Sequence, residues 1–124
     1  MKIELSLSYP KGLSVNAIWK PVKYKMILNP KAKKYKDEMY FLIRQQYPKN
    51  DFNFGSVPLT MCISIYPPDN RVRDIDNVAK IILDALQYSK VYDNDNQIQK
   101  LIIERKEIKK PKGLLLVCIE SLKD

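Results

Sequence analysis

Polar and apolar residues alternate over residues 2–9, where Ile3, Leu5 and Leu7 share one side, which predicts a β-strand buried on one face. Further strands, rich in aliphatic and β-branched residues, are expected at residues 57–66, 97–108 and 113–121. Leu59, Ile63 and either Met61 or Cys62 are the core candidates of the second strand. A short extended piece is expected at residues 24–28.

Two segments show the three- and four-residue spacing of amphipathic helices. The first is predicted over residues 30–46, with Pro30 at the first helical position. Its core stripe is Ala32, Tyr35, Met39 and Leu42, and its outward residues include Lys33, Lys34 and Asp37. The second is predicted over residues 76–88, with Asp76 as its N-cap. Its buried face is Val78, Ala79, Ile82, Ala85 and Leu86.

The predicted order of elements is β-α-β-α-β-β, which indicates an α+β fold with a mixed β-sheet and two helices packed on one face. The last two strands are separated by residues 109–113, which resemble a hairpin turn with Gly113 at a positive φ. The chain has 124 residues and no internal repeat or linker-like stretch. We therefore expect a single domain over residues 1–124.

The chain contains no histidine and only three glycines, all isolated from one another. This excludes Ser-His-Asp and Cys-His catalysis, histidine-ligated metals, and the glycine-rich loops that bind nucleotide cofactors. Cys62 and Cys118 lie in apolar runs without a CxxC motif, so reduced core thiols are expected. The longest apolar run, residues 114–119, is too short to span a bilayer. A soluble cytoplasmic protein without membrane contact is the expectation.

The net charge is +8, and the basic excess is N-terminal, with eleven Lys or Arg against three Asp or Glu in residues 1–50. Seven lysines lie between Trp19 and Asp37, together with Tyr24 and Tyr35. This mixture suits phosphate contacts beside packed bases or sugars, although a solvated helix face has the same composition. The candidate DNA contacts in this region are Lys20, Lys23, Lys25, Lys33 and Lys34.

A concentration of charge lies between the second strand and the second helix. Asp74 and Asp76 are two positions apart, so in an extended chain their carboxylates point to the same side. Lys80 lies one helical turn after Asp76, while Ile75 is expected to point into the core. A second acidic group, residues 93–95, follows the helix. The sequence does not determine which end of the helix it approaches.

Carboxylates and an amine in a basic protein suggest a magnesium site for phosphodiester hydrolysis, because Mg²⁺ prefers hard oxygen ligands. A purely structural interpretation also exists. In that interpretation Asp76 is only an N-cap and Asp74 pairs with Arg71 or Arg73. Lys80 then pairs with Asp84, one turn further along its helix.

The segment Arg73-Asp-Ile-Asp-Asn-Val-Ala-Lys, followed by Leu83-Asp-Ala-Leu and Asp93-Asn-Asp-Asn-Gln-Ile, resembles the signature of the RusA-type Holliday junction resolvases of phages and prophages. Residues 14–19 and 32–36 are similar to that family's basic N-terminal region. The resemblance implies a Mg²⁺-dependent homodimer, with Mn²⁺ as a substitute, that nicks branched DNA at four-way junctions symmetrically during recombination and repair. It also implies a bacterial host cytoplasm, with the protein on the nucleoid when bound to DNA.

The resemblance assigns roles to individual residues. Asp74 and Asp76 match the paired metal-binding aspartates, Lys80 the catalytic lysine, and Asp95 the third carboxylate. Asp93 is the alternative third ligand, because Asn94 stands where the family usually has an aspartate. Asn16 matches a residue of the substrate loop or one that supports the site, and Arg71 and Arg73 either contact phosphate or pair with the acidic group.

Two competing functions remain at this stage. One is a protein that binds branched DNA without cutting it, which the presence of Asp74, Asp76 and Lys80 together argues against. The other is a general metal-dependent nuclease that acts on flaps or RNA, which only a panel of substrates distinguishes from a junction resolvase.

Overall fold

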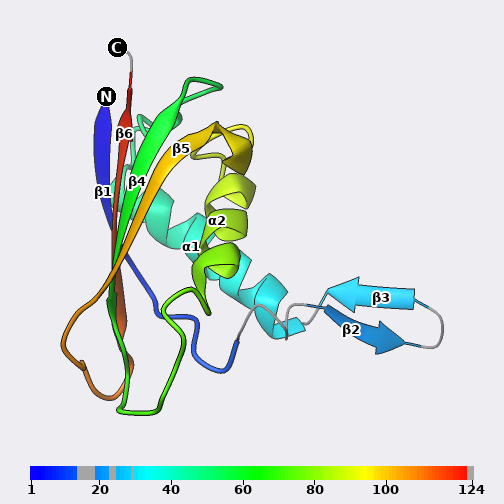
Figure 1. Cartoon of the computed structure of the whole chain (residues 1–124). Helices are drawn as coiled ribbons and strands as arrows, with labels where there is room; N and C mark the ends of the chain where they lie inside the picture. The colour runs from blue at the N-terminus through cyan, green and yellow to red at the C-terminus, as the bar shows by residue number, and fades with distance from the viewer. Residues whose placement is uncertain (14–18, 23–24, 29, 123–124) are drawn as a thin grey trace.

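The computed structural model describes residues 1–13, 19–22, 25–28 and 30–122 (Figure 1). The elements in chain order are β1 (Lys2–Leu7), β2 (Trp19–Val22), β3 (Lys25–Leu28), α1 (Pro30–Gln46), β4 (Leu59–Tyr66), α2 (Ala79–Tyr88), the short 3₁₀ helix η2 (Asp95–Gln97), β5 (Ile98–Arg105) and β6 (Leu114–Ser121). The predicted β-α-β-α-β-β order and the bounds of α1 are confirmed. The short extended piece belongs to a β2–β3 hairpin, of which only the second strand was predicted.

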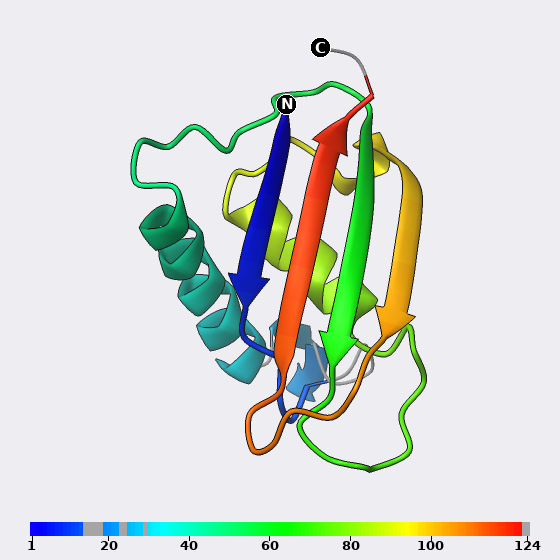
Figure 2. The same cartoon turned by 90° about the vertical axis from the view of Figure 1, so that its left-hand side faces the viewer.

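Four strands form a mixed sheet in the order β1-β6-β4-β5, and both helices cover the same face of it (Figures 1 and 2). β4 and β5 are parallel, whereas β6 is antiparallel to both β4 and β1. A parallel pair needs a crossover connection, and α2 supplies it between β4 and β5. The α+β fold with both helices on one face is therefore confirmed.

The predicted hairpin between the last two strands is wrong, because β4 lies between β5 and β6. Residues 106–113, here called the basic loop, instead cross the end of β4. The backbone N–H groups of Lys106 and Lys109 donate to the carbonyls of Ile65 and Pro67, each at 2.8 Å. Gly113 has the predicted positive φ of 72°, and a Cβ on it would lie 2.8 Å from the carbonyl oxygen of Tyr66. Position 113 therefore requires glycine, because the basic loop passes too close to the backbone of Tyr66 for a Cβ to fit.

The core lies between the sheet and the helices and follows the predicted alternation. Ile3, Leu5 and Leu7 are buried, and Lys33, Lys34 and Asp37 are exposed on α1, both as predicted. The buried residues of β4 are Leu59, Met61, Ile63 and Ile65. The buried residues of the helices are Ala32, Tyr35, Met39 and Ile43 in α1, and Ile81, Ile82, Ala85 and Leu86 in α2. Leu42 is only partly buried, because Ile43 takes the core position in that turn.

Three local predictions are corrected. Cys62 and Cys118 are free thiols, but they lie half-buried opposite each other on the face of the sheet that carries no helix, because Met61 takes the core side. α2 begins at Ala79 rather than at residue 76, and its N-cap position has no side-chain capping bond. Ile75 is 44% exposed, because residues 75–78 form turns ahead of the helix.

Among the described residues no helix has the length and apolar character that crossing a membrane would require.

Replacing Gly113 with alanine should destabilise the fold more than the same change at Gly55. Both glycines have positive φ, 72° and 68°, but only Gly113 has backbone atoms within 4 Å of an added Cβ. We expect Gly55→Ala to cost about 1 kcal/mol for the left-handed backbone. Gly113→Ala should cost about 1–3 kcal/mol more for the overlap. Urea unfolding measures both, and equal losses would contradict the close crossing.

Candidate functional site

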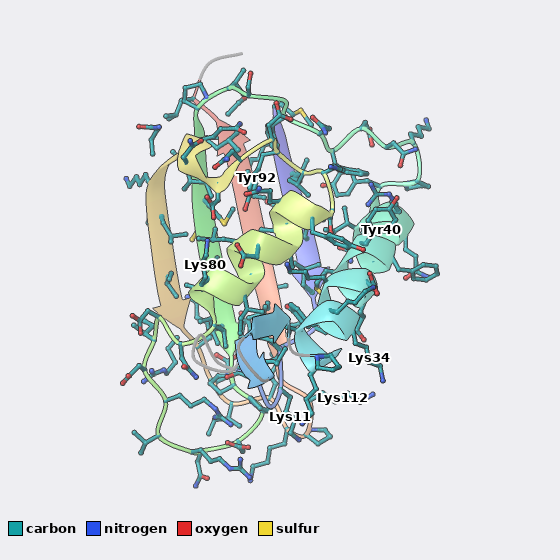
Figure 3. All side chains as sticks on the ribbon, turned by 90° about the vertical axis from the view of Figure 1, so that its right-hand side faces the viewer. Lys11, Lys34, Tyr40, Lys80, Tyr92 and Lys112 are labelled. Atoms are coloured by element: carbon teal, nitrogen blue, oxygen red, sulfur yellow. The ribbon has the colours of Figure 1, made fainter. Side chains whose placement is uncertain are left out.

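Three segments that are distant in the sequence meet at one end of the sheet (Figure 2). They are residues 67–78 between β4 and α2, here called the acidic loop, the basic loop, and the chain just after β1. The Lys11 ammonium donates to the carbonyl of Pro111 at 3.4 Å, which joins two of these segments. Figure 3 shows Lys11, Lys34 and Lys112 at this end of the molecule. The exposed basic residues of the two loops are Arg71, Lys106, Lys109, Lys110 and Lys112, and Arg105 at the end of β5 is exposed next to them.

Sequence reasoning missed this second basic region, because residues 109–113 were interpreted only as a turn. The signal was present in the run Lys109-Lys-Pro-Lys, but its proximity to the acidic loop depends on the strand order.

Asp69 organises the acidic loop. Its Oδ1 accepts the backbone N–H of Arg71 at 3.0 Å and pairs with Nη2 of Arg73 at 2.7 Å. The Arg71 N–H is the main cause that holds the pKa of Asp69 below its usual value, and the Arg73 guanidinium adds to it. Arg71 approaches Asp69 less closely, with Nε 3.8 Å from Oδ2. Both arginines therefore pair with Asp69 and not with Asp74.

Asp74 and Asp76 precede α2 and are both exposed. Their backbone carbonyls accept the N–H groups of Asn77 and Ala79, each at 3.1 Å, so the turns use the backbone of these residues and not their carboxylates. Neither carboxylate forms an ion pair with another residue in the part of the chain that the structure describes. Two unpaired carboxylates thus stand at the start of α2, where the helix dipole favours negative charge.

Lys80 follows on the first turn of α2 and is bound from two sides (Figure 3). Its Nζ lies 3.1 Å from Oδ1 of Asp84 and 3.1 Å from Oδ2 of Asp95. The hydrogen bonds to Asp84 and then to Asp95 raise the pKa of Lys80 above its usual value, so it remains an ammonium ion at neutral pH. The pair with Asp84 that the structural interpretation predicts is present. The contact with Asp95 is present as well, and it shows that residues 93–95 approach the first turn of α2, which the sequence left open.

Asp95 is positioned by the short helix η2. Asn94 caps η2 by accepting the N–H of Asn96, while Gln97 accepts the N–H of Asn94 at 2.7 Å. Gln87 of α2 accepts the Asp95 N–H at 3.0 Å. The cap on η2 thus holds in place the backbone that carries Asp95.

Asp93, the alternative third ligand, is exposed and lines a hollow with Lys36, Asp84 and Tyr88. Of the two candidates, Asp95 is the one in contact with Lys80.

Within the described residues, no three Asp, Glu or Cys side chains are close enough together to hold a metal ion. The donor set that suits Mg²⁺ is the pair Asp74 and Asp76, because Mg²⁺ is commonly held by one or two carboxylates while waters and substrate phosphate complete its octahedron. Oδ2 of Asp95 is bound to Lys80, and its Oδ1 accepts no hydrogen bond from a described residue.

The predicted N-terminal contacts are described only in part. Asn16 and Lys23 lie outside the described residues. Lys20 and Lys25 belong to the β2–β3 hairpin, which lies beyond the N-terminal end of α1 (Figure 1). Lys33 and Lys34 are exposed on α1, and Lys33 pairs with Asp37 at 3.2 Å.

The family model described as "Endodeoxyribonuclease RusA" matches residues 9–117. A protein of Enterobacteria phage HK97 named crossover junction endodeoxyribonuclease rusA is 31% identical over 116 residues, which cover 94% of this chain and 92% of the relative. The crossover junction endodeoxyribonuclease RusA of Aquifex aeolicus is 27% identical over 116 residues, which cover 93% of this chain and 89% of the relative.

The family match includes β4, the acidic loop, α2, η2 and β5 in full. It therefore includes every residue of what is here called the acidic site, namely Asp74, Asp76, Lys80, Asp84 and Asp95. From the extent of this match and the identity to the phage protein over nearly the whole of both chains, we conclude that the chain belongs to the RusA endodeoxyribonuclease family.

Proposed function

We propose that the protein is a Mg²⁺-dependent endonuclease that acts as a homodimer and resolves four-way DNA junctions by paired nicks, in DNA recombination and repair. Mn²⁺ would substitute for Mg²⁺. The observation that carries this proposal has two parts. Asp74 and Asp76 are exposed ahead of α2 and form no ion pair among the described residues, and Lys80 on the first turn of α2 is held by two further aspartates. The names of the phage and Aquifex relatives support the choice of substrate.

Phosphodiester hydrolysis requires an activated water and compensation for the charge that develops on the phosphoryl group. Asp74 and Asp76 would hold a Mg²⁺ ion, which when bound supplies both. The exposure of these carboxylates leaves them accessible to a phosphate of bound DNA. Oδ1 of Asp95 accepts no hydrogen bond from a described residue, and Asp95 is therefore the candidate for a further ligand.

Lys80 would donate a hydrogen bond to the developing charge on the phosphate or the leaving oxygen. Its contacts with Asp84 and Asp95 orient the ammonium group and preserve its charge. A group that is charged and oriented before the substrate binds needs little rearrangement in the transition state, which is the main source of electrostatic catalysis.

A homodimer follows from the symmetry of the substrate. The strands of a four-way junction that are cut are related in pairs, whereas one subunit of 124 residues with one acidic site reaches only one of them. The exposed lysines and arginines of the two loops would contact the phosphates and orient the DNA arms.

Removing either unpaired carboxylate should separate cutting from binding. The unmodified protein should cut a labelled four-way junction with Mg²⁺ but not with EDTA, and should leave matched duplex and single strands intact. Asp74→Asn and Asp76→Asn should each slow this cutting about 100-fold or more. Gel shifts in EDTA should show equal or tighter junction binding, since less negative charge faces the phosphates.

Asp93→Asn is the matched acidic substitution, and we expect a smaller cleavage defect than for Asp95→Asn. Loss of binding in step with cleavage would show that Asp74 and Asp76 maintain the fold or contact DNA. Equal cutting of flaps or RNA would indicate a general nuclease.

The role of Asp95 is separable from that of Lys80 by a double-mutant cycle. Lys80→Ala should slow cleavage about 100-fold, with poor rescue by Lys80→Arg, whose planar fork places its charge differently. Its effect on stability should stay below about 1 kcal/mol, because the side chain is 53% exposed. If Asp95 acts only through Lys80, Asp95→Asn has no further effect in the Lys80→Ala background.

A further loss in the double variant, together with weaker Mg²⁺ dependence, would make Asp95 a ligand. Lys100→Ala, an exposed lysine on β5, is the control and should leave the rate unchanged. Near-normal cleavage by Lys80→Ala would exclude a catalytic role for Lys80.

Paired nicking predicts how a mixed dimer behaves. A dimer of one unmodified and one Asp76→Asn subunit should convert a supercoiled cruciform plasmid mainly to nicked circles, whereas the unmodified dimer should linearise it. Agarose gels separate the two products. Efficient linearisation by the mixed dimer, or by protein that sedimentation shows to be monomeric, would contradict the paired-site model.

A further inference from the structure

A cavity of about 330 Å³ opens beside Asp74, between the acidic loop and the start of the basic loop. Its lining includes Tyr9, Arg73, Asp74, Ile75, Arg105 and Ile108. The volume is at the lower end of the range for small-ligand sites. We infer that this cavity receives one unstacked nucleobase of the bound DNA, from a nucleotide next to the cleaved phosphodiester. The inference rests on the proposed function.

Apolar side chains form part of the cavity wall although they are open to solvent. Ile75 is 44% exposed, Ile108 is 42% exposed, and Val72 stands fully exposed between two arginines. Exposed apolar residues scattered singly need no explanation, but here Ile75 and Ile108 line the same cavity on a basic surface. Such walls match the apolar faces of a planar base.

Polar groups in the same cavity are held in place before any ligand binds. Arg73 is fixed by Asp69 at 2.7 Å, and its guanidinium carbon lies 5.7 Å from the centre of the Tyr9 ring. Arg105 donates a hydrogen bond to the backbone carbonyl of Arg73. Burial raises the pKa of Tyr9, so the ring remains a neutral phenol. Guanidinium groups offer donors to the acceptor edge of a base.

The cavity wall combines apolar and cationic side chains, and this combination favours a nucleotide over other ligands. A free phosphate would find cations but gain nothing from Ile75 and Ile108, whereas an apolar peptide would leave the arginines without acceptors. A nucleotide uses both, because its base fits the cavity while Arg71, whose side chain is 80% exposed, reaches the adjoining phosphate.

The cavity also has a consequence for substrate choice. Asp74 belongs both to the cavity wall and to the candidate metal site, so a base in the cavity belongs to a nucleotide at the cut. Unstacking is easiest where pairing is already interrupted. A base site here therefore favours the branch point of a junction over continuous duplex.

Two measurements test the inference. In Asp76→Asn protein, junctions with 2-aminopurine at each position flanking the branch point should show, at one position, a several-fold rise in emission on binding, because stacking quenches this base. In the cutting-competent protein, Ile108→Trp should fill the cavity and slow cleavage at least tenfold with binding nearly unchanged. An abasic nucleotide at the responsive position should restore the rate of Ile108→Trp.

Ile102→Trp is the matched control, because Ile102 is 40% exposed on β5, outside the cavity lining. Its cleavage should equal that of the unmodified protein. The 2-aminopurine measurement does not use Ile108→Trp, so it decides the question even if that variant fails to fold.

The inference is overturned if no position responds, if Ile108→Trp cuts normally, or if it is slowed equally on the abasic junction. It is also overturned if Ile108→Trp shifts the oligomeric state in sedimentation, which would make the cavity a protein interface. If the protein cuts junctions but 2-aminopurine stays stacked, only this inference is wrong. If the protein neither binds nor cuts junctions, the proposed function is wrong as well.

Discussion

The parallel pairing of β4 with β5 is the constraint on which the acidic site depends. Parallel neighbours require the chain to return along the sheet, and α2 makes this return. Asp74 and Asp76 therefore precede the helix, while Asp95 follows it. Within the described residues these three carboxylates do not form one cluster. Lys80, on the first turn of α2, contacts Asp95 from the far side of the crossover.

The same topology gathers positive charge beside the acidic loop. β6 lies between β1 and β4, so the basic loop must cross the end of β4, and Gly113 permits the close passage. Lysines near position 110 are thereby brought next to Lys11, a contact between segments about a hundred residues apart. The basic loop and the chain after β1 carry cations, which attract phosphates to this surface. The acidic loop beside them carries the carboxylates, which stay available to hold a metal ion.

Asp69 keeps the arginines of the acidic loop from pairing with Asp74. By binding Arg73 and, more loosely, Arg71, it satisfies the cations that would otherwise pair with Asp74. The carboxylate of Asp69 thus organises the loop, and those of Asp74 and Asp76 remain for the candidate metal site. The same interaction fixes Arg73 in the wall of the cavity beside Asp74, so the order of the acidic loop and the shape of the cavity have a common physical origin.

The sequence alone determined what depends on near neighbours. The alternation of Ile3, Leu5 and Leu7 and the bounds of α1 were predictable because local periodicity and capping decide them, and the acidic motif identified the family. The tertiary structure decided the rest. Ile75 is exposed because turns precede α2, and Cys62 lies on the open face because the helices cover the side that Met61 occupies. The contact of Lys80 with Asp95 and the crossing of the basic loop depend on which strands are neighbours. Strand order results from pairing between distant segments, which no local pattern records.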